Sequence, residues 1–198
     1  VIPVIAIESV DSALDLADTL ISGGLPIAEI TFRTKAAADV ISKLRRERSD
    51  LLLGAGTVLT VDNLKKAKEC GAMFAVAPGL NPELVSTAKE IGLPFIPGVS
   101  NPTDIEQALS LGSKILKFFP AEACGGIKML KAISAPYQHT GVKFIPTGGI
   151  NMSNLQNYLD LPTVIACGGT WIAKKEDIAQ ARWEEIANRC QEVAQLKI

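Results

Sequence analysis

The sequence contains few of the residues that bind metals or cross-link chains. It has a single histidine, His139, and its four cysteines show no Cys-X-X-Cys spacing. A structural zinc site requires four closely spaced nitrogen or sulfur ligands, so we predict no metal site. Isolated cysteines are typical of reduced packing residues in cytoplasmic proteins. We therefore expect a cytoplasmic protein that folds without disulfides.

The sequence also has no large excess of charge of either sign and no long apolar run. Twenty lysines and arginines stand against 21 aspartates and glutamates, which leaves a formal net charge of −1. Nucleic-acid-binding proteins usually carry a large basic surface with interleaved aromatic residues, and only a short basic cluster occurs here, between Lys43 and Arg48. No apolar run reaches the length that spans a membrane. The sequence therefore predicts neither a nucleic-acid partner nor a membrane segment.

What the sequence does contain is a regular alternation of two patterns. Short apolar or β-branched runs, typical of buried parallel strands, are followed by amphipathic stretches of helical period. Asn81-Pro82 and Asn101-Pro102 carry the start signals of helices, a capping side chain before a proline. The expected strands are Pro3–Ile7, Ile27–Thr31, Leu51–Ala55, Phe74–Ala77, Pro94–Pro97, Lys114–Phe119, Lys143–Pro146 and Val164–Cys167.

Eight strands that each precede a helix close into a (β/α)8 barrel, or TIM barrel. We predict an α/β fold of this kind as a single domain over residues 1–198. The alternative is an open doubly wound sheet, which usually has a glycine-rich turn after its first strand. Glu8-Ser9-Val10 stand at that place here. In barrels the active site lies at the carboxyl ends of the strands, so the residues there are the candidates for chemistry.

Lys117 is the most unusual residue near these strand ends. It lies in the apolar run Ile-Leu-Lys-Phe-Phe-Pro, where an ammonium group without a partner is costly to bury. Burial lowers the pKa of a lysine, and the neutral amine is the nucleophile that Schiff-base chemistry requires. The alternative is a structural ion pair with a carboxylate such as Glu29 or Glu122.

Glu29 and Arg33 follow one another along the second expected strand. Glu29 lies in an apolar run, where it could move protons beside a lysine imine or form only a structural salt bridge. Arg33 lies near the end of the strand, where its guanidinium could bind a carboxylate through two nitrogens or lie exposed on the surface. The residues alone leave these alternatives open.

Two glycine pairs follow the last two expected strands. They are Thr147-Gly148-Gly149 and Gly168-Gly169-Thr170. Glycines allow backbone N–H groups to converge on an anion, and the loops after strands seven and eight are the usual phosphate site of a barrel. Each pair alone is also common in ordinary turns. The two together, at this place, predict a phosphate site.

Six motifs then occur in a fixed order along the chain: Glu29-Ile-Thr-Phe-Arg33-Thr, Gly54-Ala-Gly-Thr57-Val, Ala77-Pro78-Gly79, Lys117-Phe-Phe-Pro-Ala-Glu122, Pro146-Thr-Gly-Gly149 and Gly168-Gly-Thr-Trp171. In these motifs the sequence resembles the 2-keto-3-deoxy-6-phosphogluconate (KDPG) / 4-hydroxy-2-oxoglutarate (KHG) aldolases. The resemblance runs from about Val1 to the region of Trp171. Several motifs in order make it far more specific than any single one.

The resemblance implies a class I aldolase that needs no cofactor or metal and is usually a homotrimer. Such an enzyme cleaves KDPG to pyruvate and glyceraldehyde 3-phosphate, or KHG to pyruvate and glyoxylate. Lys117 would form the imine with the keto carbon, and Glu29 would be the general acid/base. The remaining implied contacts are Arg33, Thr57 and Thr147 to the carboxylate and nearby hydroxyls, Phe119 and Pro78 as pocket walls, and Gly148, Gly149, Gly168, Gly169 and Thr170 to the phosphate.

Two departures from the family pattern bear on these expectations. The last motif commonly reads Gly-Gly-Ser-Trp, and Thr170 replaces the serine with a hydroxyl that carries an extra methyl group. The sequence also has little of the helix that family members carry before the first strand. The alternatives that stay open are the galactonate-specific aldolase, a phosphate-binding isomerase or synthase on the same barrel, and a catalytically silent anion-binding or oligomeric barrel.

Overall fold

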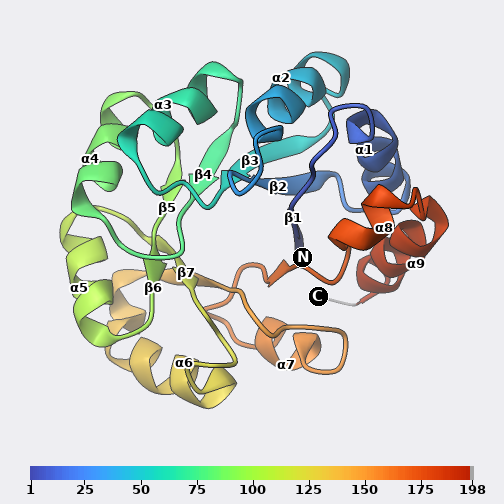
Figure 1. Ribbon diagram of the computed structural model, residues 1–198. Coiled ribbons are helices and arrows are strands. Elements are labelled where there is room, and N and C mark those ends of the chain that lie inside the picture. Colours follow the sequence, from blue (N-terminus) through green and yellow to red (C-terminus); the bar gives the residue numbers. More distant parts are fainter. Residues whose placement is uncertain (197–198) are drawn as a thin grey trace.

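Parallel strands alternate with helices along the chain in the computed structural model, which describes residues 1–196 (Figure 1). The strands are β1 (Ile2–Ile5), β2 (Ile27–Thr31), β3 (Leu52–Gly56), β4 (Phe74–Val76), β5 (Phe95–Ile96), β6 (Gly98–Val99), β7 (Ile115–Phe118), β8 (Lys143–Pro146) and β9 (Gly168–Gly169). The helices are α1 (Ala13–Ser22), α2 (Ala37–Glu47), α3 (Val61–Glu69), α4 (Pro82–Glu90), α5 (Pro102–Ser110), α6 (Gly126–Ser134), the 3-10 helix η1 (Ala135–Thr140), α7 (Leu155–Leu159), α8 (Lys175–Ala179) and α9 (Trp183–Ala194). The last two residues of the domain predicted from the sequence, 197 and 198, lie outside the described residues.

The strands form two parallel sheets that follow one curled arrangement, with the helices on its outer side (Figure 1). Six strands pair in the order β5-β4-β3-β2-β1-β9, and three more pair in the order β6-β7-β8. Isolated parallel bridges join Phe144 to Val164 and Thr147 to Gly168, between β8 and the segment that ends in β9. The predicted α/β class with parallel strands is therefore confirmed, in the form of a strongly curved sheet.

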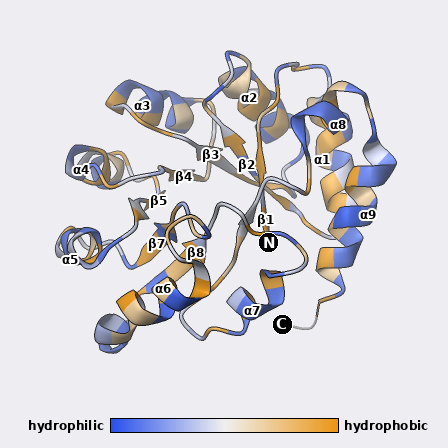
Figure 2. Cartoon of the chain, turned by 60° about the horizontal axis from the view of Figure 1, so that its bottom comes forward, coloured by the Kyte–Doolittle hydropathy of each residue, from blue (hydrophilic) through white to orange (hydrophobic). Residues whose placement is uncertain are grey.

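The core lies between the sheet and the helices. Ile5, Ile30 and Phe118 on the strands and Leu16 and Leu64 on the helices are almost completely buried. Figure 2 shows hydrophilic residues on the outward sides of peripheral helices such as α3 and α4, as expected for amphipathic helices that cover a sheet. This packing makes the sheet a rigid support for side chains at its carboxyl edge.

Helix starts follow the local sequence signals. The side chains of Asn81 and Asn101 accept hydrogen bonds from the backbone N–H groups of Glu83 and Asp104, and a proline follows each asparagine at the first helical position. Thr60 caps α3 in the same way. A capping side chain satisfies one of the N–H groups that the first helical turn leaves without a partner. These boundaries are accordingly readable from the sequence.

Two of the expected strands were placed incorrectly. Val164–Cys167 is not a strand, because only Val164 forms a bridge, and regular pairing begins at β9, where Gly168 pairs with Ile2. The predicted strand Pro94–Pro97 ends at Ile96, and after Pro97 the chain continues as β6, which pairs with β7. Proline has no N–H group to donate to a strand ladder, which explains the break at Pro97.

No helix in the described part of the chain is long and apolar enough to cross a membrane.

Candidate active site

Lys117 on β7 and Glu29 on β2 meet inside the curled sheet. The Nζ atom of Lys117 lies 3.3 Å from Oε1 of Glu29. Lys117 is only 6% exposed and Glu29 only 3% exposed. Two opposite charges in so little contact with water require each other, since either one alone would be costly to bury. The two most unusual residues of the sequence are therefore brought together.

Glu122, the other carboxylate considered as a partner for Lys117, has a different contact. Its Oε1 atom accepts a hydrogen bond from the hydroxyl of Tyr158, which is almost fully buried. Burial, together with this bond to Glu122, raises the pKa of Tyr158 above its ordinary value. Tyr158 was not singled out in the sequence, because a tyrosine in an amphipathic helix carries no signal beyond packing.

Glycines allow close approaches beside both members of the Lys117–Glu29 pair. A Cβ atom on Gly56 would lie 2.2 Å from Oε1 of Glu29, too close for any real contact. Gly98 pairs with Lys117 in the sheet, and a Cβ atom there would lie 2.1 Å from the carbonyl oxygen of Pro78. Pro78 therefore lies directly beside β6, next to the strand that carries the lysine.

Phe119 lies near the lysine, and Thr57 directly follows the carboxyl end of β3. The Phe119 ring centroid lies 5.5 Å from Nζ of Lys117, within reach of a cation–π interaction. Thr57 follows β3 with a φ angle of 56°, a conformation that β-branched residues rarely adopt. Backbone strain of this kind costs about 1–3 kcal/mol and is concentrated at functional sites.

Arg33 lies two residues beyond the carboxyl end of β2, and its side chain is exposed. Its Nε atom donates a hydrogen bond of 3.2 Å to Oγ1 of Thr31. Thr31 is itself buried and ends the strand that carries Glu29. The sequence left open whether Arg33 is exposed or binds a carboxylate. The side chain is exposed, but its bond to Thr31 restrains it.

The two glycine pairs lie side by side. Thr147 forms a parallel bridge with Gly168, and a Cβ atom on Gly168 would lie 2.3 Å from Oγ1 of Thr147. Gly148 and Gly149 have φ angles of 101° and 79°, which L side chains rarely adopt. The sequence placed Gly168 and Gly169 in the loop after the last strand, but they form the strand β9 and are buried. Thr170 beyond them is exposed. The pairing nevertheless joins both predicted phosphate segments at one place.

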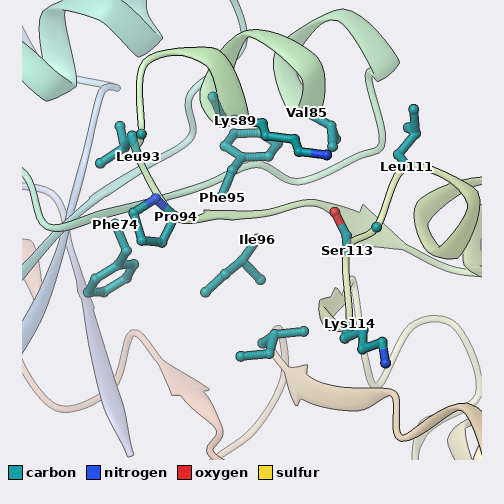
Figure 3. A pocket seen from close by; sticks show the side chains of 14 residues that line it. Phe74, Val85, Lys89, Leu93, Pro94, Phe95, Ile96, Leu111, Ser113 and Lys114 are labelled. Carbon is teal, nitrogen blue, oxygen red and sulfur yellow. The ribbon is translucent and has the colours of Figure 1, made fainter.

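A large cavity of about 800 Å³ lies elsewhere, where β4, β5 and β7 begin. Figure 3 shows Phe74, Pro94, Phe95 and Ile96 among its lining side chains, with Lys114 at one side. These residues stand at the amino ends of the strands, whereas catalytic groups of such folds lie at the carboxyl ends. The cavity is therefore separate from the site around Lys117.

Fold and site together give an α/β protein with a buried amine beside a buried carboxylate, an arrangement that suits covalent chemistry on a carbonyl substrate. The family model "KDPG and KHG aldolase" matches residues 1–189. The chain belongs to this aldolase family and is accordingly a carbon–carbon lyase. The family that the sequence motifs predicted is thereby confirmed.

Relatives and solved structures agree with this assignment. The 2-dehydro-3-deoxy-phosphogluconate aldolase of Haemophilus influenzae is 49% identical over 98% of this chain and 90% of the relative. The KDPG aldolase of Legionella pneumophila, solved with pyruvate captured as a covalent carbinolamine, has a TM-score of 0.93 and 42% identity over 97% of this chain and 92% of the other. The KDPG aldolase of Zymomonas mobilis, solved with 3-phosphoglycerate, has a TM-score of 0.90 and 36% identity over 99% and 91%.

Proposed function

We propose that this enzyme reversibly cleaves 2-dehydro-3-deoxy-6-phosphogluconate to pyruvate and glyceraldehyde 3-phosphate through an imine on Lys117. The observation that carries the proposal is the buried contact of 3.3 Å between Lys117 and Glu29. The covalent pyruvate carbinolamine described for the Legionella relative supports the same chemistry, and the Haemophilus relative bears the name of this activity.

The reaction begins when Lys117 passes a proton to the Glu29 carboxylate and the neutral amine attacks the C2 carbonyl of the substrate. Loss of water from the carbinolamine leaves an iminium ion, which accepts electrons. The C4 hydroxyl then gives its proton to the Glu29 carboxylate, the C3–C4 bond breaks, and the electron pair of that bond moves into the iminium. Glyceraldehyde 3-phosphate leaves, and an enamine stays on the lysine. Covalent catalysis of this kind divides one difficult step into several easier ones.

Glu29 acts as the general acid/base in this scheme. Its carboxyl group lies within hydrogen-bonding distance of the lysine nitrogen, so it can take up and return protons during carbinolamine and imine formation. It then helps to protonate C3 of the enamine, which gives the pyruvate imine. Water hydrolyses this imine, and pyruvate and the free Lys117 amine are restored.

The residues around the pair supply binding contacts. We propose that Arg33, Thr57 and Thr147 bind the pyruvate carboxylate and nearby hydroxyls. Phe119 and Pro78 line the substrate pocket. The phosphate is held by the joined glycine segments, Gly148, Gly149, Gly168, Gly169 and Thr170. Their backbone N–H groups suit an anion, and the bridge from Thr147 to Gly168 supports this assignment by keeping the two segments together.

The finer features of the architecture belong to the same proposal. We infer that the two sheets close into one eight-stranded barrel, with β5 and β6 as the halves of one strand and the bridges at Val164 and Gly168 completing the circuit. We take this barrel as one domain over residues 1–198 and as the subunit of a cytoplasmic homotrimer. The unpaired state of the four cysteines is compatible with a reducing compartment.

A second activity is supported by the breadth of the family model, whose description covers KHG as well as KDPG aldolases. We propose that the enzyme also cleaves 4-hydroxy-2-oxoglutarate to pyruvate and glyoxylate, because imine formation at C2 uses only the 2-keto acid part of the substrate. The phosphate contacts would then be empty. We expect kcat/KM to be lower for this substrate than for KDPG.

Borohydride reduction in the presence of pyruvate tests the proposed mechanism. The wild-type protein should lose activity irreversibly, and peptide mass mapping should place one reduced pyruvate adduct on Lys117. Lys114→Met is the matched control, because Lys114 lies three residues earlier and is exposed. This variant should be trapped normally, whereas a folded Lys117→Met protein should not.

The absence of an adduct in folded wild-type protein that binds pyruvate would contradict the imine mechanism. An adduct on Lys117 without cleavage of KDPG would contradict the substrate assignment alone. Parallel assays with the gluconate- and galactonate-derived substrates then separate the two C4 configurations.

A further inference from the structure

Thr31 connects the arginine of the site to the neighbouring strand. It is 1% exposed and ends β2, two residues after Glu29 and two before Arg33. Its hydroxyl donates a hydrogen bond of 2.9 Å to the carbonyl oxygen of Ile5 on β1. The hydroxyl oxygen of Thr31, Oγ1, in turn accepts a hydrogen bond of 3.2 Å from Nε of Arg33. A continuous chain of hydrogen bonds thus runs from β1 to the guanidinium group.

The direction of these bonds follows from the chemistry of a hydroxyl group. A threonine has one hydroxyl proton and two acceptor lone pairs. Because the proton of Thr31 is donated to Ile5, only lone pairs are available to Arg33, which can only donate. The Nε edge of the guanidinium is therefore held by the protein, and within residues 1–196 its two terminal nitrogens have no hydrogen-bond partner.

We propose that Thr31 is a positioning residue that holds Arg33 so that its two terminal nitrogens face the carboxylate of the 2-keto acid. The inference rests on the proposed role of Arg33 in binding that carboxylate. An arginine side chain has several rotatable bonds and is otherwise exposed here. Fixing its Nε edge before the substrate arrives leaves less to be ordered on binding, and the terminal nitrogens can then make a paired contact with two carboxylate oxygens.

Thr31 also fastens β2 to β1, and this structural role must be separated from the positioning role. Thr34 is the matched control, because its hydroxyl donates a hydrogen bond of 2.7 Å to the carbonyl oxygen of Ile7 just beyond β1. Thr34 thus makes the same kind of bond between the same two segments. Its hydroxyl has no hydrogen bond with Arg33 in the described residues.

Steady-state kinetics of Thr31→Val, Thr31→Ser and Thr34→Val test the proposal. Thr31→Val keeps the shape and removes the hydroxyl, and it should raise KM about tenfold while kcat changes less than threefold. Thr31→Ser should restore KM to within about twofold of the wild type, since it keeps the hydroxyl. Thr34→Val should leave KM unchanged. Thr31→Ala serves in place of the valine variant if that protein does not fold.

A double-mutant cycle with Arg33→Met decides whether Thr31 acts through the arginine. In the Arg33→Met background, Thr31→Val should change KM by less than about twofold, because the group that it positions is gone. Equal effects of Thr31→Val in both backgrounds would overturn the proposal and leave a structural role. An unchanged KM in Arg33→Met alone would overturn it too, and would show that the carboxylate assignment of Arg33 has failed. Borohydride trapping on Lys117 in these variants reports separately on the imine mechanism.

Discussion

Nζ of Lys117 lies 3.3 Å from Oε1 of Glu29, although the two residues are 88 positions apart in the chain and belong to strands of different sheets. Both side chains are buried, so each charge depends on the other for a partner. The contact is thus part of the fold as well as of the proposed chemistry. Variants of the two residues should therefore change both the free energy of unfolding and the turnover.

Replacement of Lys117 by methionine should abolish turnover and lower the free energy of unfolding by about 3–5 kcal/mol, because a buried Glu29 is left without its partner. Adding Glu29→Gln should recover part of this loss of stability without restoring activity. Urea unfolding of the wild type, both single variants and the double variant measures the coupling. A Lys117→Met protein as stable as the wild type would show that the two charges do not depend on each other.

Gly56→Ala should disturb the site directly, because the new Cβ would lie 2.2 Å from the Glu29 carboxyl oxygen. We expect a loss of kcat/KM of at least tenfold and a destabilisation of about 1–3 kcal/mol, the usual cost of an overpacked core. Gly79→Ala is the control, since a Cβ there would meet no atom within 4 Å. If the two variants were equally active, the close approach of Gly56 to Glu29 would have no effect on catalysis.

Tyr158→Phe should weaken the support of the segments proposed to bind phosphate. Its hydroxyl donates to Glu122, and Glu122 donates its backbone N–H to the carbonyl oxygen of Gly148 at 3.0 Å. We expect a loss of about 1 kcal/mol in stability and a larger fall in kcat/KM for the phosphorylated substrate than for KHG.

The hydrogen bond from the half-buried Tyr137 to Glu106, which lies at the surface, provides the control for this change. Tyr137→Phe removes the same tyrosine–glutamate bond at the surface, where a hydrogen bond contributes little to stability. It should leave the kinetics with both substrates unchanged. Equal losses for both substrates in Tyr158→Phe would contradict a specific link to phosphate binding.

Alkaline conditions should destabilise the fold through its buried thiols. Burial raises the pKa of Cys190 to about 11 and that of Cys167 to about 12, from an ordinary value of 9.0. The folded thiols stay neutral where the unfolded ones ionise, so their contribution is complete below pH 9 and is lost as the pH rises through 11 to 12.

Cys190→Ala isolates one of these contributions. The stability difference between the wild type and this variant should shrink by about 1 kcal/mol between pH 8 and pH 10, because only the wild type loses the contribution of this thiol. Urea unfolding at the two pH values gives the comparison. A difference that does not change with pH would mean that Cys190 ionises equally in both states.

Much of the architecture was predictable because its causes are local. β2, β4 and β8 lie within one residue of their expected bounds, since a buried parallel strand needs a continuous apolar run. Asn81 and Asn101 start their helices as predicted, because a cap acts within a few residues. The ordered motifs likewise identified the family.

The misplacement of the last expected strand has a non-local cause. Val164–Cys167 has the composition of a strand, but regular pairing with β1 begins only at Gly168, where a close approach to Thr147 requires glycine. Composition says which residues can pair, whereas the position of the neighbouring backbones decides which of them do.

The sequence by itself determined the alternation of strands and helices, the family, and the residue types available at the carboxyl ends of the strands. Only the tertiary structure decided that Lys117 pairs with Glu29 and not with Glu122. It also decided that Tyr158 donates a hydrogen bond to Glu122 and that Thr31 accepts one from Arg33. The first two contacts join residues far apart in the chain. Thr31 and Arg33 are two residues apart, but the Thr31 hydroxyl is oriented by its bond to Ile5, 26 positions away on β1. Burial and hydrogen bonding depend on which side chains the packed sheet brings within contact distance. The order of residues along the chain does not specify these distances.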